Sequence, residues 1–128
     1  MGLPRALKAH GAGSLEEAEH HYRRAYDQGQ KTDILYQNFG ALLKKVGKID
    51  QATLLFEEGI NSFPQHPGIK RNYANLLRAN RPAYAIELYI SAIHLLLNAQ
   101  DSELLDSCFD DLIELLRERQ LLFWSRSL

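Results

Sequence analysis

Residues 38–45 read Asn-Phe-Gly-Ala-Leu-Leu-Lys-Lys, and residues 72–79 read Asn-Tyr-Ala-Asn-Leu-Leu-Arg-Ala. The two stretches lie thirty-four residues apart and share an asparagine, an aromatic residue, a small residue and a pair of leucines in the same order. A fixed spacing of this length is typical of proteins built from repeated supersecondary units, each of which buries its apolar face against its neighbours. The sequence therefore predicts a repeat protein.

A second pattern recurs between and around these stretches. A small residue is followed by an aromatic residue four positions later and by another small residue three positions after that. The pattern occurs three times, at Ala18/Tyr22/Ala25, Ala52/Phe56/Gly59 and Ala85/Tyr89/Ala92. The first two copies are thirty-four residues apart, and the third follows after thirty-three because one residue is missing from the turn before it. The repeat therefore begins before the first complete copy.

The apolar residues recur at intervals of three and four, which predicts helices, and no segment sustains the alternation of a strand. Helices are expected over Leu15 to Gln28, Asp33 to Val46 and Gln51 to Ser62. Ser14 with Glu17 fits a capping box at the first of these helices, and Pro82 fits the first turn of a later helix. Glycines and prolines separate the segments, so the sequence predicts an all-α protein of paired helices.

Small residues at fixed positions predict how the helices pack. Gly40 and Gly59 leave room for a neighbouring helix to approach closely, whereas Phe39 and Phe56 are large enough to fill the gaps. Small residues facing large ones at a constant period are expected in stacked helical hairpins.

Residues 101–128 predict a terminal helix that covers the last hairpin and is capped by Asp101 or Ser102. Its apolar residues are expected to form one stripe: Leu104, Leu105, Cys108, Phe109, Leu112, Ile113 and Leu116. The acidic residues Asp106, Asp110, Asp111 and Glu114 are expected on its solvated face. Leu121 to Trp124 then form an apolar cluster with three interpretations. The cluster folds back on the helix, docks onto a second copy of the chain, or is buried by a further element of a longer protein.

The spacing Tyr36-x2-Phe39-Gly40-x2-Leu43, followed by Ala52-x3-Phe56 and Pro64, resembles the tetratricopeptide repeat. The resemblance implies a right-handed solenoid of antiparallel helix pairs. It divides the chain into a partial repeat (1–32), two full repeats (33–66 and 67–100) and a capping helix with its tail (101–128). Within the partial repeat, residues 14–30 match only the second helix, because Leu3 to His10 is short and weakly patterned.

The resemblance implies a non-catalytic protein-interaction scaffold, because the first helix of each hairpin lines a concave groove in this family. The expected peptide-binding residues are Gln37, Asn38 and Lys45, together with Arg71, Asn72, Asn75 and Arg78. This set is polar with an excess of positive charge, which favours an extended, acidic peptide as the ligand. The alternative is that Lys44, Lys45, Arg71 and Arg78 only keep the surface soluble.

Asn38 and Asn72 occupy equivalent repeat positions, and Asn75 lies one turn further on. They are similar to the asparagine ladder in the repeat superhelix of O-linked N-acetylglucosamine transferases, where side-chain amides hold a peptide backbone. Asp106 stands at the next position of the ladder. The alternative function is therefore the substrate-recognition arm of a larger enzyme such as a glycosyltransferase. A third is a structural oligomerisation unit, with a homodimer through Leu121 to Trp124.

The carboxylate clamp by which some relatives hold chaperone tails is not expected. It needs a lysine and an asparagine where this chain offers Leu3 and Leu7, and basic residues where Gly68 and Asn72 stand.

Composition argues against several other classes. Lys and Arg total 15 against 16 for Asp and Glu, so the net charge does not attract the whole molecule to nucleic acid or to a membrane. The first thirteen residues lack the apolar core of a signal peptide, and the single Cys108 is expected to be a buried small residue, so a cytoplasmic protein is predicted. The five histidines show no metal-ligand spacing, so neither a metal nor a cofactor is expected.

Overall fold

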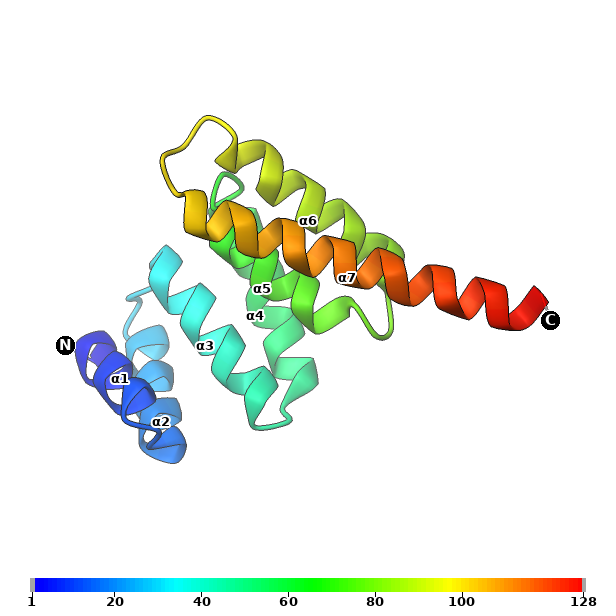
Figure 1. The fold of residues 1–128 in the computed structure, drawn as a ribbon. Coiled ribbons are helices and arrows are strands. Elements are labelled where there is room, and N and C mark those ends of the chain that lie inside the picture. The colour runs from blue at the N-terminus through cyan, green and yellow to red at the C-terminus, as the bar shows by residue number, and fades with distance from the viewer. Residues whose placement is uncertain (1, 128) are drawn as a thin grey trace. The chain divides into compact units, whose positions relative to one another are not determined.

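The computed structural model describes residues 2–127, with side chains to residue 124, and Figure 1 shows its fold. The described residues form helices and no strand, which confirms the all-α prediction. The helices are α1 (Gly2–Gly11), α2 (Leu15–Asp27), α3 (Asp33–Lys45), α4 (Ile49–Ser62), α5 (Pro67–Leu77), α6 (Pro82–Leu96) and α7 (Ser102–Ser127). They form two compact units, one ending at Pro64 and the other beginning at Gln65.

The first unit consists of two helical hairpins, α1 with α2 and α3 with α4. Equivalent glycines, Gly13 and Gly47, make the turn within each hairpin with φ angles of 80° and 84°, a left-handed conformation that favours glycine. In both turns the next backbone N–H reaches back to the preceding helix: Ser14 N donates to Ala9 O over 2.9 Å, and Lys48 N donates to Leu43 O over 2.8 Å. The repeat therefore extends to the geometry of the turns.

Small residues face large ones inside the first unit, as the sequence predicted. A Cβ atom on Gly59 would lie 2.8 Å from the Cβ of Tyr36, so α3 and α4 approach too closely for any side chain there. Between the hairpins, the rings of Tyr22 on α2 and Phe39 on α3 stack with centroids 5.4 Å apart. Both rings are buried. This packing joins one hairpin to the next.

The N-terminal segment differs from the sequence prediction, because both helices of its hairpin are present. Helix α1 packs against α2 and buries Ala6 and Ala9. A Cβ on Gly2 would lie 3.0 Å from the carbonyl oxygen of His21, so the two helices also meet closely at this end. Small residues allow this approach but give only a weak hydrophobic pattern, which is why the sequence indicated one helix here instead of two.

The predictions of how the helices begin are confirmed in part. Ser14 precedes α2, but its side chain makes no capping hydrogen bond, so the predicted capping box is wrong. Thr32 caps α3 instead, where its hydroxyl accepts from Leu35 N over 3.2 Å. At α7 the predicted cap is confirmed, because Asp101 Oδ1 accepts from Leu104 N over 3.0 Å. Pro82 stands in the first turn of α6, as predicted.

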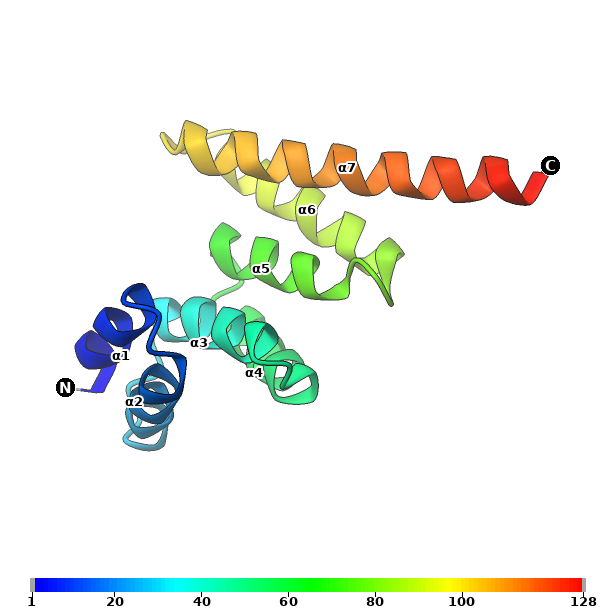
Figure 2. The same ribbon diagram turned by 60° about the horizontal axis from the view of Figure 1, so that its bottom comes forward.

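The second unit contains the α5–α6 hairpin and α7, which packs against both helices of that hairpin. Figure 2 shows α7 as one continuous helix whose C-terminal part continues past α5 and α6. Cys108 of α7 is fully buried against α6, beside Ala92, Ile93 and Leu96. This confirms the prediction of a buried cysteine and of a terminal helix that covers the last hairpin.

The apolar residues of α7 form two faces, so the prediction of one stripe is wrong. Leu104, Leu105 and Leu112 pack beside Cys108 against α6. Phe109, Ile113 and Leu116 lie on another side of the helix and are exposed. The cluster from Leu121 to Trp124 continues the helix and is also exposed, which contradicts the interpretation that it folds back.

Candidate peptide-binding surface

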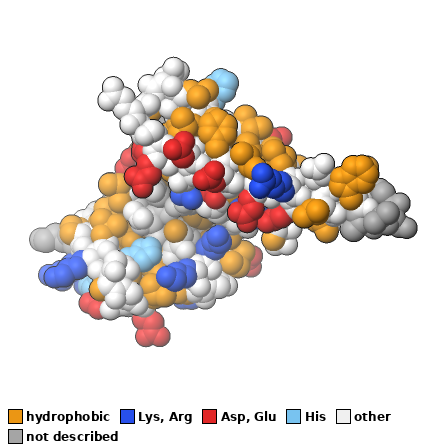
Figure 3. All heavy atoms as spheres, in the orientation of Figure 1, with side chains coloured by type: hydrophobic (Ala, Val, Ile, Leu, Met, Phe, Trp, Pro, Cys, Tyr) orange, Lys and Arg blue, Asp and Glu red, His pale blue; other side chains and the backbone are white. Residues whose placement is uncertain are grey.

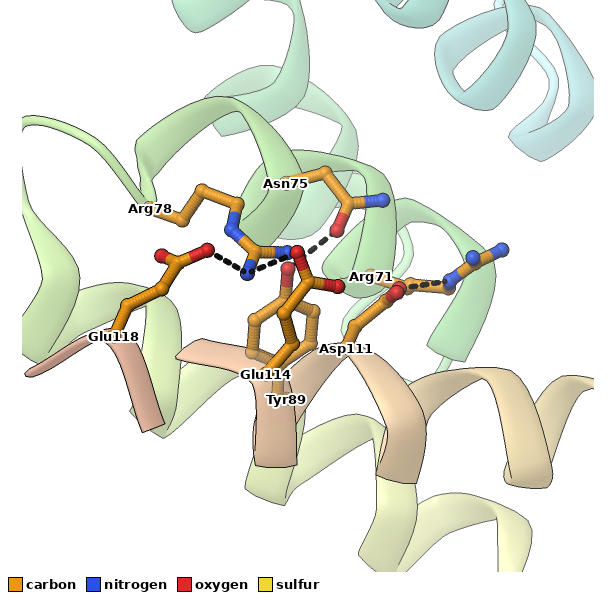
Figure 4. Close-up of polar contacts among 7 residues, drawn as sticks. All are labelled: Arg71, Asn75, Arg78, Tyr89, Asp111, Glu114 and Glu118. Carbon is orange, nitrogen blue, oxygen red and sulfur yellow. Dashed lines mark hydrogen bonds and ion pairs between the residues drawn. The ribbon is translucent and has the colours of Figure 1, made fainter. Parts of the chain in front are cut away.

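Three of the predicted binding residues form a row along α5 that ends at its C-cap residue, Arg78. Arg71, Asn75 and Arg78 are separated by four and then three residues, so they share one side of the helix. Figure 4 shows that this side is turned toward α7, from which carboxylates point back. The row is half-buried, in contrast to a fully solvated surface.

Acidic residues of α7 pair with this row (Figure 4). Arg71 Nε donates to Asp111 Oδ2 over 2.9 Å. Arg78 Nη2 lies 3.4 Å from Glu118 Oε1 and 3.7 Å from Glu114 Oε1. Asp111 and Glu114 were predicted on a merely solvated face, and the structure corrects this because both carboxylates face arginines of α5. The arginines therefore already bind carboxylates within the chain.

Asn75, in the middle of the row, accepts a hydrogen bond from a residue of α6. The hydroxyl of Tyr89 donates to Asn75 Oδ1 (Figure 4). Burial raises the pKa of Tyr89 to about 12, so this hydroxyl keeps its proton at neutral pH and remains a donor. The hydrogen bond fixes the orientation of the Asn75 amide, since its oxygen must face the hydroxyl.

The three α7 carboxylates and the Tyr89 hydroxyl were not predicted to belong to this surface. The sequence does contain a spacing that matches these carboxylates to the arginines. Arg71 and Arg78 are seven residues apart, and so are Asp111 and Glu118, each forty residues further along the chain. Two helices that run side by side in the same direction can match such a spacing over two turns.

The remaining predicted residue of α5, Asn72, is half-buried. Gln37 on α3 is half-buried as well, and both residues interact with neighbouring groups. Asn38 Nδ2 donates to the carbonyl oxygen of Ile34, one turn earlier on its own helix, over 3.1 Å. The α3 residues belong to the first unit and the α5 residues to the second.

Lys45, the third predicted residue of α3, lies in the neighbourhood of α1. Burial and then the positive charge of Lys45 lower the pKa of His10 on α1. His10 Nδ1 lies 2.7 Å from the Tyr22 hydroxyl, and burial raises the pKa of that hydroxyl to about 12. Neutral His10 and protonated Tyr22 therefore form a hydrogen bond between α1 and α2 at pH 7. The first helices of both hairpins, α1 and α3, are in contact here.

The described residues contain no arrangement that points to metal or membrane chemistry. No group of three or more His, Cys, Asp or Glu side chains within residues 2–124 is placed to hold a metal ion. None of the described helices combines the length and the apolar character that crossing a bilayer requires.

These hairpins define a tetratricopeptide-like helical-repeat fold, and comparison with solved structures shows the same. The Yersinia enterocolitica type III secretion translocator chaperone SycD is similar in two solved structures. One, an alternative dimer, has a TM-score of 0.82 and 19% identity, covering 92% of this chain and 91% of SycD. The other has a TM-score of 0.84 and 17% identity, covering 93% and 83%.

A structure of the first tetratricopeptide repeat domain of Spaghetti (RPAP3), bound to the HSP90 peptide SRMEEVD, is also similar. Its TM-score is 0.78 at 13% identity, covering 93% of this chain and 90% of that domain. No family model matches the sequence, and no curated protein matches it either. The similarity at these low identities concerns the fold.

Proposed function

We propose that the chain is a non-catalytic protein-interaction scaffold for an extended, acidic peptide, and that the predicted residues of α3 in the first unit and of α5 in the second each contribute to binding. The observation that carries the proposal is the row on α5, where Arg71 and Arg78 pair with three carboxylates of α7 at 2.9 to 3.7 Å. A surface that holds a line of carboxylates from its own chain has the charge and spacing to hold those of a ligand.

The ligand's backbone would be bound by the asparagines. An amide side chain offers both a donor and an acceptor, so it can bind a peptide group whatever the sequence of the peptide. Asn38 now donates to its own helix, at a carbonyl that already belongs to the helical ladder. Exchanging this bond for one to a peptide carbonyl leaves no buried group unpaired, so the exchange costs little.

Both structural neighbours support a protein or peptide as the ligand, and one of them supports an acidic peptide. SycD is a chaperone of translocators, and the RPAP3 domain holds a peptide with three acidic residues, SRMEEVD. This chain lacks the residues of the carboxylate clamp, having Leu3, Leu7 and Gly68 at its positions. We therefore propose recognition of acidic side chains along an extended segment in place of recognition of a chain's terminal carboxylate.

The test uses a fluorescein-labelled peptide of six Ala-Glu units, with six Ala-Gln units as the uncharged control, and measures anisotropy. We expect the acidic peptide to bind more tightly. The variant Asn38→Ala/Asn72→Ala should lose about tenfold in affinity or more, because each amide contributes about 1 kcal/mol. Equal binding of the two peptides would contradict the preference for acid.

The matched control is Asn61→Ala/Asn80→Ala. It removes the same two side-chain amides from exposed positions, one on α4 and one in the turn before α6. Its affinity should equal that of the unmodified chain. If the Asn38/Asn72 variant also binds unchanged, these asparagines do not hold the backbone of the peptide.

We also propose that the chain self-associates through α7. This helix leaves large apolar side chains exposed, including the predicted dimer segment Leu121 to Trp124. Apolar side chains clustered in this way are typical of a surface that another protein covers. The SycD neighbour, which forms dimers, supports this second part of the proposal.

A further inference from the structure

The exposed apolar residues of α7 follow a heptad spacing. Phe109, Ile113, Leu116 and Phe123 are 41%, 43%, 46% and 65% exposed, and we call them the outer face of α7. The intervals between them are four, three and seven residues, and Gln120 occupies the position that would divide the last interval. Alternating steps of three and four are the pattern by which one helix packs along another. In Figure 3, hydrophobic side chains are visible at the surface along α7, up to the grey C-terminal residues.

We infer that the partner of the outer face is the α7 helix of a second copy, paired antiparallel. This inference rests on the proposed self-association and names its surface and orientation. The charges beside the outer face select a second copy as the occupant. Asp110 and Arg117 are seven residues apart, so they flank the same edge of the outer face, one toward each end.

An antiparallel pair brings these two residues together across the interface. With the two-fold axis between positions 113 and 114, Asp110 of each copy faces Arg117 of the other copy, which makes two ion pairs. A parallel pair would set Asp110 and Arg117 beside Leu105 and Leu112, and the charges would stay unpaired. The sequence of α7 is therefore complementary to itself in one orientation only.

Within the chain, Asp110 and Arg117 differ from the other charged residues of α7. Asp111, Glu114 and Glu118 face arginines of α5. Asp110 and Arg117 are exposed, and neither forms an ion pair with another side chain among residues 2–124. The charges of α7 thus divide into a set that holds the helix to its own hairpin and a pair that remains for a partner.

The outer face has the size of a weak, specific interface. The exposed parts of these four side chains and the flanking residues of α7 together bury on the order of 1,000 Å² from the two copies, which is the low end for specific protein contacts. We therefore expect a dimer that dissociates in the micromolar range, so that monomer and dimer coexist at ordinary working concentrations.

The experiment is sedimentation equilibrium of the 128-residue chain from about 1 to about 100 µM, a range that spans the expected dissociation constant. The unmodified chain should pass from monomer to dimer. Ile113→Asp should stay monomeric, since it places a charge in the centre of the outer face. Circular dichroism checks that each variant keeps its helices. Lys44→Asp, a charge reversal at an exposed position of α3, should leave the dissociation constant unchanged.

Charge reversal tests the orientation. Asp110→Arg alone and Arg117→Asp alone should each weaken the dimer at least tenfold, because like charges then meet twice per dimer. The combination Asp110→Arg/Arg117→Asp restores opposite charges and should recover the affinity. A dimer that forms but ignores these changes overturns the antiparallel pairing and leaves self-association standing. A chain that is monomeric at every concentration overturns both, and neither result bears on peptide binding.

Discussion

The ring of Phe56 on α4 fills the space in which a side chain on Gly40 of α3 would lie. A Cβ atom on Gly40 would come within 2.8 Å of three atoms of this ring. Both positions belong to the repeated pattern that identifies the fold, and Phe56 is fully buried. The separation of α3 and α4 is therefore set by one aromatic ring seated directly on a helix backbone.

Gly40→Ala should destabilise the protein by about 1 to 3 kcal/mol, the usual cost of adding an atom to a filled core. Urea unfolding followed by circular dichroism measures this. Gly11→Ala is the matched control, because a Cβ at Gly11 meets nothing within 4 Å, and it should be neutral or slightly stabilising. Combining Gly40→Ala with Phe56→Leu should recover part of the loss. If Gly40→Ala unfolds at the same urea concentration as the unmodified chain, the ring does not set the helix separation.

Glu58 connects the two hairpins of the first unit. Its carboxylate accepts from the hydroxyls of Tyr26 on α2 and Tyr36 on α3, over 2.6 and 2.9 Å. Lys31, in the segment between those helices, lies 3.5 Å away. The hydrogen bond from Tyr26 is the largest of the effects that lower the pKa of Glu58. Ionised Glu58 therefore stabilises the fold.

We expect Glu58→Gln to lower the free energy of unfolding at pH 7 by about 1 kcal/mol, because neutral hydrogen bonds replace charge-assisted ones at a partly exposed site. The sign of the pH dependence follows from the lowered pKa. The stabilisation is complete above the ordinary value of 4.5 and is lost as the pH falls through the lower value of the folded state. The difference between the two proteins should close in acid. Glu87→Gln, an exposed change on α6, is the control and should leave the free energy of unfolding at pH 7 nearly unchanged.

The hairpins could be predicted because repeated residues act locally. Gly40, Phe56 and Gly59 specify close packing within a single hairpin, and the period transfers that assignment from one copy to the next. Helix α1 could not be found in this way, since Ala6 and Ala9 bury little surface and leave a weak pattern. Its stability comes from its contact with α2, which sequence periodicity does not report.

The binding surface was harder to predict than the fold. The repeat period assigned Arg71 and Arg78 to a first helix, where their spacing of seven residues sets them on one face. It could not show that α7 brings Asp111 and Glu118 to that face, because the partner of a charged side chain depends on how helices distant in sequence pack. One stripe was predicted on α7 for the same reason, since apolar spacing does not tell which of two adjacent faces is covered.

Cys108 should react slowly with thiol reagents in the folded protein. Burial raises the pKa of its thiol, so little of the reactive thiolate is present at pH 8, and the side chain is not exposed. Dithionitrobenzoate should therefore modify the native chain at least tenfold more slowly than the chain in urea. Cys108→Ser should destabilise by about 1 to 2 kcal/mol, because its hydroxyl would be buried among apolar side chains, while Cys108→Ala should cost less. Fast native labelling would show that α7 leaves α6 readily.

Two of the three ion pairs that join Arg71 and Arg78 to α7 should differ in strength. Arg71 and Asp111 are 29% and 20% exposed and 2.9 Å apart, whereas Glu118, the partner of Arg78, is 53% exposed. Water screens the second pair more. A double-mutant cycle on Arg71 and Asp111 should give a coupling energy of about 1 kcal/mol, and the cycle on Arg78 and Glu118 about 0.3 kcal/mol. Equal couplings would mean that exposure does not separate the pairs.

If the α5 arginines bind an acidic peptide, the α7 carboxylates compete with it for the same guanidinium groups. Asp111→Asn/Glu118→Gln should then raise the affinity for the six-unit Ala-Glu peptide, by about fivefold, since each competing pair is worth a few tenths to 1 kcal/mol. The affinity for the Ala-Gln peptide should stay the same.

A change in net charge alone would also favour an acidic ligand, so the control removes two charges elsewhere on α7. Glu103→Gln/Asp106→Asn changes the net charge by the same amount at exposed positions that pair with no α5 arginine. If the carboxylates compete locally, the affinity for the Ala-Glu peptide should rise in Asp111→Asn/Glu118→Gln and change little in Glu103→Gln/Asp106→Asn. This rise in affinity should persist at 0.5 M salt, where long-range attraction is screened within about 5 Å. Equal gains that vanish in salt would show that the peptide responds to overall charge and does not bind at Arg71 and Arg78.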